Sequence, residues 1–393
     1  MSQLLINRSP DLKRLRDEGY EIEVRSNHLL VHSVPYMNAK GVVARGTLVS
    51  PLTLAGDVTT RPTDHIAYFI GEHPCRNDKT LIPQIKHQSN RSQLATDVCI
   101  DHSFSNKPVE GYANYYEKMT RYIEIISSYA IFFDPTLTAR TFKVVESKES
   151  SSPFVYVDTA SSRSGIGAIS EKLALSKIAI VGLGGTGSYI LDLLAKTPVK
   201  EIHLFDGDVF LQHNSFRSPG AASLDDLLAQ PSKVQYFKNT YSKMHKNIIA
   251  HEGFVTEANV NNLEGFDFVF LSIDKGAVKK LIIEELQKNR IPFIDVGMGI
   301  EVSEDSGALL GICRVTTNSA LKSDHILKRI SLSDAADDGV YGSNIQVADL
   351  NALNAVLAVI KWKKLYGFYH DMELEHHSTY STNVNQLLSE ELA

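Results

Sequence analysis

One short segment limits what this chain can fold into, a turn with four glycines that directly follows an apolar run. Residues 177–181 read KIAIV, and residues 182–187 read GLGGTG, which fits the spacing G-x-G-x-x-G. Glycines at this spacing allow a tight turn between a strand and a helix, and they let backbone N–H groups and the helix N-terminus approach a phosphate. The phosphate contacts are expected from Gly182, Gly184, Gly185, Thr186 and Gly187.

The segments around this turn alternate between apolar runs and amphipathic runs. Strands are predicted at 177–182, 201–206, 266–274 and 292–297, and helices at 171–176, 188–197, 232–244 and 276–289. The strands are almost continuously apolar, as expected where helices cover both faces of a parallel sheet. The pattern therefore predicts an α/β fold with a doubly wound, Rossmann-like domain. Further on, a strand at 307–317, a long helix within 344–368 and an extended tail are expected.

A serine-rich segment at 148–165 separates two regions of different character. A chain of 393 residues is long for one domain, so two are expected. The earlier region reads as short strands at 28–37, 41–50 and 64–71, followed by a helix within 111–133. We therefore predict a smaller α+β domain at 1–155, which binds a partner, and a nucleotide-binding domain at 162–393.

Charge and composition exclude several classes of protein. The net charge is −6 and the chain has no Lys/Arg-rich run, so nucleic acid is not expected as the main partner. No run approaches the ~18 apolar residues that a membrane span needs, and the charged N-terminus does not resemble a secretory signal. Three widely spaced cysteines, Cys75, Cys99 and Cys313, fit a reducing compartment. A cytoplasmic protein is expected.

Charged and polar residues follow the strands downstream of the glycine turn. In chain order they are Asp206, Asp208, Asn214, Arg217, Lys233 and Asp274. An NAD-binding unit, the first alternative, has a use for Asp206 beside a ribose but none for two cations and a further carboxylate. Transfer of a nucleotide to a carboxylate needs such groups, because negative charge builds up on the phosphates as pyrophosphate leaves.

The same residues carry a resemblance to a known family. Residues 177–368 resemble the ThiF/MoeB and ubiquitin-activating-enzyme adenylation family, whose pattern runs GxGGxG, DxDxVxxxNxxR, a lysine and an aspartate; Phe210 stands where the pattern has valine. The resemblance implies ATP and Mg²⁺ as cofactors, with Asp206 at the ribose and Asp274 at the metal. It assigns the phosphates to Asn214, Arg217 and Lys233.

The resemblance also implies an activity and partners. It implies an adenylyltransferase that activates the C-terminus of a ubiquitin-like protein, with transfer to a conjugating-enzyme-like acceptor as a further step. Members pair as homodimers and borrow an arginine from upstream of the first strand, for which Arg163 is the candidate. The N-terminal region resembles an uncharacterised domain that precedes ThiF-type domains in bacterial proteins. The alternatives are adenylation of a small-molecule or peptide carboxylate and a nucleotide-binding scaffold without catalysis.

One feature departs from the family. Many members carry a catalytic cysteine in the loop before the last long helix, whereas residues 318–344 contain none. Cys313 lies in the apolar run ALLGICRV and is expected to be a buried strand residue. We therefore expect no cysteine to carry the activated acyl group. Hydroxyl acceptors stay open as an alternative, namely Thr316, Thr317, Ser331 and Ser333.

Overall fold

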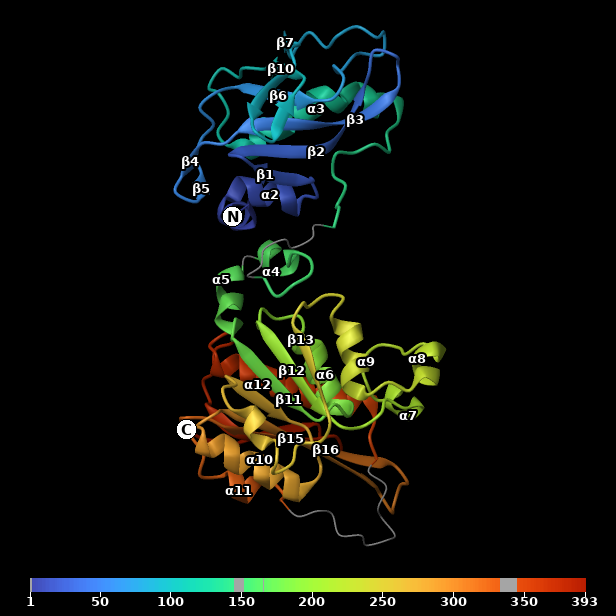
Figure 1. Ribbon diagram of the computed structural model, residues 1–393, viewed down its shortest axis with the longest axis vertical. Helices are drawn as coiled ribbons and strands as arrows, with labels where there is room; N and C mark the ends of the chain where they lie inside the picture. The colour runs from blue at the N-terminus through green and yellow to red at the C-terminus, as the bar shows by residue number, and fades with distance from the viewer. Residues whose placement is uncertain (1, 145–151, 165, 333–344) are drawn as a thin grey trace. The chain divides into compact units, whose positions relative to one another are not determined.

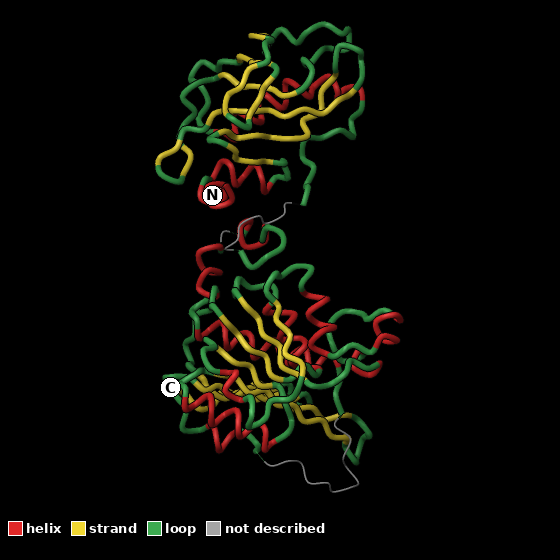
Figure 2. The backbone as a smooth tube through the Cα atoms, viewed as in Figure 1, coloured by secondary structure: helices red, strands yellow, loops and turns green. Residues whose placement is uncertain are grey.

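The computed structural model describes residues 2–144, 152–164, 166–332 and 345–393, and its contacts divide the chain into two units (Figures 1 and 2). The N-terminal unit comprises Met1–Val145 with Thr159–Ser164, and the C-terminal unit comprises Glu146–Asp158 with Gly165–Ala393. No helix among the described residues is both long and apolar enough to span a lipid bilayer.

The N-terminal unit is built on an antiparallel sheet of six strands in the order β1-β2-β3-β6-β10-β7. Helix α3 (Tyr115–Phe133) packs on this sheet and buries Tyr115, Met119, Tyr122 and Ile126 at helical intervals. Its first turn is capped by Asn114, whose side chain accepts a hydrogen bond from the Glu117 N–H group. The strands are β1 (Ile22–Arg25), β2 (His28–Met37), β3 (Val43–Pro51), β6 (Ile66–Ile70), β7 (Lys86–Gln88) and β10 (His102–Ser105).

The C-terminal unit is built on an eight-stranded sheet in the order β13-β12-β11-β14-β15-β16-β17-β18. Neighbours from β13 to β15 are parallel, and neighbours from β15 to β18 are antiparallel. The strands are β11 (Lys177–Val181), β12 (Glu201–Asp206), β13 (Ile248–Glu252), β14 (Phe268–Leu271), β15 (Phe293–Val302), β16 (Leu309–Asn318), β17 (Glu375–Ser381) and β18 (Gln386–Leu392). The predicted α/β fold is confirmed, and an antiparallel extension widens the sheet on one side.

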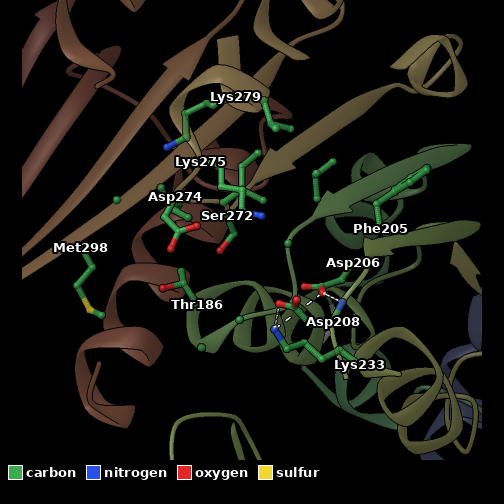
Figure 3. Close-up of a pocket in the computed structure, with 18 of the residues that line it drawn as sticks. Thr186, Phe205, Asp206, Asp208, Lys233, Ser272, Asp274, Lys275, Lys279 and Met298 are labelled. Carbon is green, nitrogen blue, oxygen red and sulfur yellow. Dashed lines mark hydrogen bonds and ion pairs between the residues drawn. The ribbon is translucent and has the colours of Figure 1, made fainter. Parts of the chain in front are cut away.

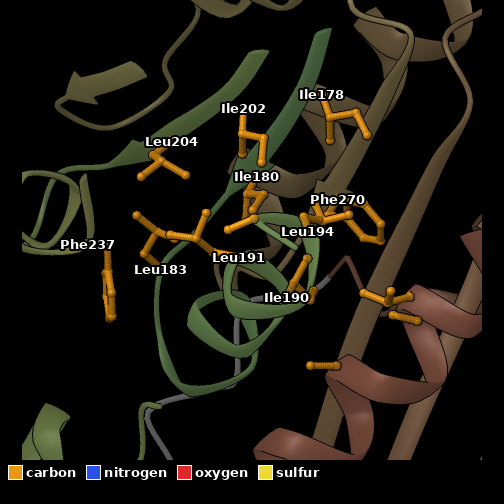
Figure 4. Close-up of a cluster of buried hydrophobic side chains, with 14 of the residues drawn as sticks. Ile178, Ile180, Leu183, Ile190, Leu191, Leu194, Ile202, Leu204, Phe237 and Phe270 are labelled. Carbon is orange, nitrogen blue, oxygen red and sulfur yellow. The ribbon is translucent and has the colours of Figure 1, made fainter. Parts of the chain in front are cut away.

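Helices cover both faces of the parallel part of this sheet, as its apolar strands predict. On one face Ile178 and Ile180 pack in a cluster with residues of α6 (Gly185–Leu194), α9 (Lys233–Tyr241) and α12 (Ala348–Leu365) (Figure 4). On the other face Ala179 and Val181 pack with residues of α10 (Gly276–Lys288) and α11 (Ile326–Arg329). Successive residues of β11 thus enter two different cores, which makes the fold doubly wound.

Two predicted elements differ from the structure. The helix expected at 171–176 is replaced by the short α5 (Gly167–Ser170) and a 3₁₀ turn (Glu171–Leu173), because the chain enters β11 at Lys177. The tail expected to be extended forms β17 and β18, which pair with each other and extend the sheet.

The short α7 (Gln212–Ser215) and α8 (Leu224–Ala229) lie in the connection between β12 and α9.

Candidate active site

A cavity of about 660 Å³ lies at the carboxyl ends of β11, β12, β14 and β15. Parallel strands bring their carboxyl ends to one edge of a sheet, which is where α/β proteins bind ligands. Gly187 and Asn214 do not line the cavity. The sequence-predicted residues that do line it are Gly182, Gly184, Gly185, Thr186, Asp206, Asp208, Arg217, Lys233 and Asp274.

The glycines of the turn between β11 and α6 have different surroundings and meet different structural requirements. Gly182 has φ +91°, and a Cβ atom there would collide with the carbonyl oxygen of Ser272. A Cβ atom on Gly187 would collide with the carbonyl oxygen of Gly182. No atom lies within 4 Å of a Cβ built on Gly184, which faces the cavity. Gly182 and Gly187 therefore permit the packing, and Gly184 leaves space for a ligand at the N-terminus of α6.

Asp206 joins this turn to the end of β12. Its Oδ2 accepts a hydrogen bond from the Leu183 N–H group at 2.6 Å, and its Oδ1 accepts one from the Asp208 N–H group at 2.8 Å. The residue is 9% exposed, and the two bonds satisfy its buried carboxylate. The two strand ends that form this wall of the cavity are therefore fixed to each other.

Lys233 stands at the start of α9 and is held by the same carboxylates. Its Nζ donates to Asp208 Oδ2 at 2.6 Å and lies 3.8 Å from Asp206 Oδ1 (Figure 3). The lysine side chain is 8% exposed, whereas that of Asp208 is 53% exposed. The buried ammonium therefore has a fixed position at the cavity wall.

Arg217 and Asn214 come from the connection between β12 and α9. Arg217 lines the cavity, and its buried Nε has no hydrogen-bond partner among the described residues. Asn214 is buried and points elsewhere, since its Oδ1 accepts a hydrogen bond from the Leu211 N–H group at 2.8 Å. Its carbonyl oxygen accepts a hydrogen bond from the Arg217 N–H group at 3.1 Å. Asn214 thus shapes the loop that presents Arg217.

Asp274 and Ser272 follow β14 and line the cavity together with Thr186 of α6 (Figure 3). The described residues contain no group of three or more His, Cys, Asp or Glu side chains that would hold a metal ion. Mg²⁺ commonly binds through one or two carboxylates, waters and phosphate oxygens of a substrate. Asp274 therefore fits a magnesium ion that is shared with bound phosphates.

Further charged residues line the cavity that sequence reasoning did not find. Lys275 places its Nζ 4.8 Å from the centre of the Phe254 ring, a cation–π contact. Lys279 and Arg314 come from α10 and β16. Among the described lining residues five side chains are cationic and three are carboxylates, which favours an anionic ligand.

The candidate acyl acceptors differ in their access to the cavity. Cys313 is fully buried on β16, as predicted, and burial raises the pKa of its thiol to about 11. Thr316 and Thr317 are also buried. Ser331 lines the cavity, and Ser333 lies outside the described residues. Ser331 is therefore the candidate hydroxyl that lies at the cavity within the described part of the chain.

Arg163 ends the short helix α4 (Thr159–Arg163), is exposed, and belongs to the N-terminal unit.

Comparison with known proteins gives a family match for each of two regions of the chain. Residues 10–159 match a domain of unknown function (DUF6791), and residues 162–305 match the ThiF family. The tRNA threonylcarbamoyladenosine dehydratases of Haemophilus influenzae and Escherichia coli K12 are 26% and 28% identical over 129 residues, 32% of this chain. The match covers 49% and 48% of those proteins, so the chain spans about half the length of these curated relatives.

Two solved structures resemble this chain with TM-scores below 0.5. Escherichia coli MccB with MccA-N7isoAsn has a TM-score of 0.46 at 17% identity, over 57% of this chain and 66% of that chain. PaaA has a TM-score of 0.46 at 20% identity, over 57% of this chain and 76% of that chain.

Proposed function

Because residues 162–305 are a ThiF family domain, as the resemblance of the sequence predicted, we propose that this chain uses ATP to adenylate a carboxylate and releases pyrophosphate. One observation carries the proposal. Arg217, Lys233 and Asp274 share a single cavity with the N-terminus of α6, so cations, a carboxylate and backbone N–H groups converge where phosphates would bind.

In the proposed reaction a carboxylate oxygen attacks the α-phosphorus of ATP. The new bond is the acyl phosphate bond, and the bond from the α-phosphorus to the bridging oxygen of pyrophosphate breaks. No general base is required, since a carboxylate is already ionised at neutral pH. Lys233, held by Asp208, and Arg217 stabilise the charge that moves onto the phosphates.

Asp274 holds Mg²⁺ in this proposal, and the ion neutralises phosphate charge when it is bound. Asp206 stands beside the ribose. Each of its oxygens accepts one backbone hydrogen bond, and a carboxylate oxygen retains a further lone pair for a ribose hydroxyl.

For the substrate we propose the C-terminal carboxylate of a ubiquitin-like protein, recruited by the N-terminal domain at 1–155. The cavity lies at the carboxyl ends of the strands, and a flexible C-terminal tail can bring its carboxylate into it. We place this reaction in the cytoplasm. A small-molecule or peptide carboxylate is the second candidate. The curated relatives favour keeping it, since their name, tRNA threonylcarbamoyladenosine dehydratase, describes a reaction on a modified nucleoside and not on a ubiquitin-like protein.

We also propose a homodimer in which Arg163 reaches the phosphates of the partner subunit. The support is the sequence position of Arg163, just upstream of β11, where the resembled family places an arginine that completes the site of the partner subunit. Light scattering on the full chain tests it, and a stable mass near 43.6 kDa at micromolar concentration would contradict it.

Exchange of labelled pyrophosphate into ATP tests the adenylation itself. Purified protein is mixed with Mg²⁺, ATP and candidate substrates, namely small β-grasp proteins from the same organism and short peptides. We expect exchange that depends on the substrate and requires a free C-terminal carboxylate. Exchange with a C-terminally amidated substrate would contradict the proposal.

A further inference from the structure

A buried carboxylate on β15 holds two cationic side chains at the cavity wall. Asp295 is fully buried; its Oδ1 lies 3.0 Å from Lys279 Nζ, and its Oδ2 accepts a hydrogen bond from Arg314 Nη2 at 2.6 Å. The side chains of Lys279 and Arg314 are only 7% and 19% exposed, and both residues line the cavity. Asp295 therefore fixes cations from α10 and β16 at one place.

A glycine on β15 leaves room for the guanidinium group of Arg314. Gly297 of β15 pairs with Arg314 of β16, and a Cβ atom on Gly297 would lie 2.6 Å from Arg314 Nη2. Any side chain at position 297 would therefore displace the guanidinium group. Arg314 Nη1 also donates to Thr316 Oγ1 at 2.6 Å, so the guanidinium is held from two sides.

Within the described part of the chain, the ion pairs of this group do not balance, because the carboxylate of Asp295 pairs with two cations, Lys279 and Arg314. Thr316 is neutral, and its Oγ1 lies 3.0 Å from His377 Nδ1. Burial, together with the positive charges of Arg329 and Arg314, lowers the pKa of His377 to about 4, so this ring is neutral at pH 7. A buried excess charge is costly unless it has a partner. Both cations line the cavity, so an anionic ligand would be that partner.

This wall is separate from the cations at the glycine turn. Lys233 is tied to Asp208 beyond the end of β12, and β11 and β14 lie between β12 and β15 in the sheet. Three strand spacings of about 4.8 Å, roughly 14 Å, separate β12 from β15, and two spacings, roughly 10 Å, separate β15 from β11, which ends at the glycine turn. Phosphates bound at the N-terminus of α6 therefore leave a second anionic position beside β15 and β16.

The identity of the second anion rests on the proposed function. A carboxylate that attacks phosphorus loses its charge when it becomes an acyl-adenylate, so cations dedicated to it would stabilise the substrate more than the product. A group that keeps its charge throughout fits better. We propose that Lys279 and Arg314, positioned by Asp295, bind a second carboxylate of the substrate, so that the substrate carries an acidic group close to the carboxylate that reacts.

Thermal unfolding with simple carboxylates tests the proposal on the full chain. The probes are glutarate, which has two carboxylates, and butyrate, which has one, each at matched ionic strength, with and without a non-hydrolysable ATP analogue. We expect glutarate to raise the melting temperature by a few degrees and butyrate to raise it by much less. The variant Arg314→Gln should lose most of the glutarate effect and still fold, since the pair of Lys279 and Asp295 stays balanced.

The control variant is Lys280→Gln, which removes the same charge from an exposed position next to Lys279 on α10. It should respond to glutarate as the unmodified protein does. The Kd of the ATP analogue should change less than about threefold in both variants, a difference below about 1 kcal/mol.

Three results would overturn the inference. One is an unmodified protein that glutarate stabilises no more than butyrate does, and another is a glutarate effect that persists in Arg314→Gln. The third is a tenfold weaker binding of the ATP analogue by Arg314→Gln, which would place a nucleotide phosphate at Arg314. Failure of the proposed function is distinguishable, because the unmodified protein would then bind no ATP analogue or catalyse no pyrophosphate exchange whatever the response to glutarate.

Discussion

Lys233 Nζ lies 2.6 Å from Asp208 Oδ2, and this contact holds a buried ammonium against the cavity. The lysine begins α9, and its backbone N–H group donates to the Asp208 carbonyl oxygen at 2.9 Å, so backbone and side chain are anchored to the same residue. The ammonium therefore needs little rearrangement to meet a phosphate.

Lys233→Met should reduce pyrophosphate exchange by at least about 100-fold, because a positioned charge at the phosphates is lost while the aliphatic stem is kept. The matched control is Lys238→Met on the same helix, outside the cavity, which should exchange at the unmodified rate. Equal rates for the two variants would remove Lys233 from the reaction.

Asp274→Asn should reduce the rate of pyrophosphate exchange by about 100-fold or more. It should also raise the Mg²⁺ concentration that exchange requires. Asp274 is an exposed residue in the loop that follows β14, so the free energy of unfolding should change by less than about 1 kcal/mol. Asp305→Asn, an exposed carboxylate outside the cavity, is the control. A large loss of stability without ligand would make Asp274 a structural residue.

Two glycines of the turn should separate folding from binding. Gly182→Ala should lower stability by about 1–3 kcal/mol, since φ is +91° and the methyl group meets the Ser272 carbonyl oxygen. Gly184→Ala should leave stability nearly unchanged and weaken ATP binding, because its methyl group would occupy cavity space. Chemical denaturation and calorimetry measure the two effects, and the reverse order would contradict the structure.

His377 should make stability depend on pH. Its pKa is lowered to about 4 in the folded chain, from a usual value near 6.5, so the unfolded chain binds more protons between these values. The contribution of the neutral ring to the free energy of unfolding is complete above about pH 6.5. Up to about 3 kcal/mol of it is lost as the pH falls toward 4. His377→Gln should reduce the slope of unfolding free energy against pH in this window. Parallel curves would show that His377 does not titrate there.

The cysteines should differ in reactivity and be dispensable for adenylation. Cys99 is exposed, whereas Cys75 and Cys313 are buried with raised thiol pKa values. A thiol reagent at pH 8 should therefore modify Cys99 quickly and the others only after unfolding. A variant with all three cysteines replaced by serine should retain pyrophosphate exchange. Loss of acyl transfer, restored by one cysteine, would instead establish a thioester step.

The parallel core of the fold could be predicted because its strands are buried on both faces. Runs such as KIAIV and EIHLFD match β11 and β12 closely for that reason. The edge strand β13 was missed, since its sequence IIAHE is mostly half-buried and mixes polar with apolar residues. The antiparallel pairing of β16 to β18 follows from contacts between distant segments, which local patterns do not report.

The site could be predicted where a motif spaces its residues along the chain. Of the residues that the motif predicts, Asp208, Arg217, Lys233 and Asp274 line the cavity with most of the glycine turn, whereas Gly187 and Asn214 do not. The motif does not include Lys279, Asp295 and Arg314, because each lies inside a helix or strand whose sequence pattern is dominated by apolar residues. The available signal was a charged residue in the middle of each of two neighbouring apolar strands.

The two hydrogen bonds of Asp206 also have a consequence for the thermodynamics of nucleotide association. Because Leu183 and Asp208 are both bonded to this carboxylate, neither the glycine turn nor the end of β12 has to lose conformational freedom when a ligand arrives. The entropic cost of binding then falls on the nucleotide and on a few side chains, rather than on the backbone of the protein.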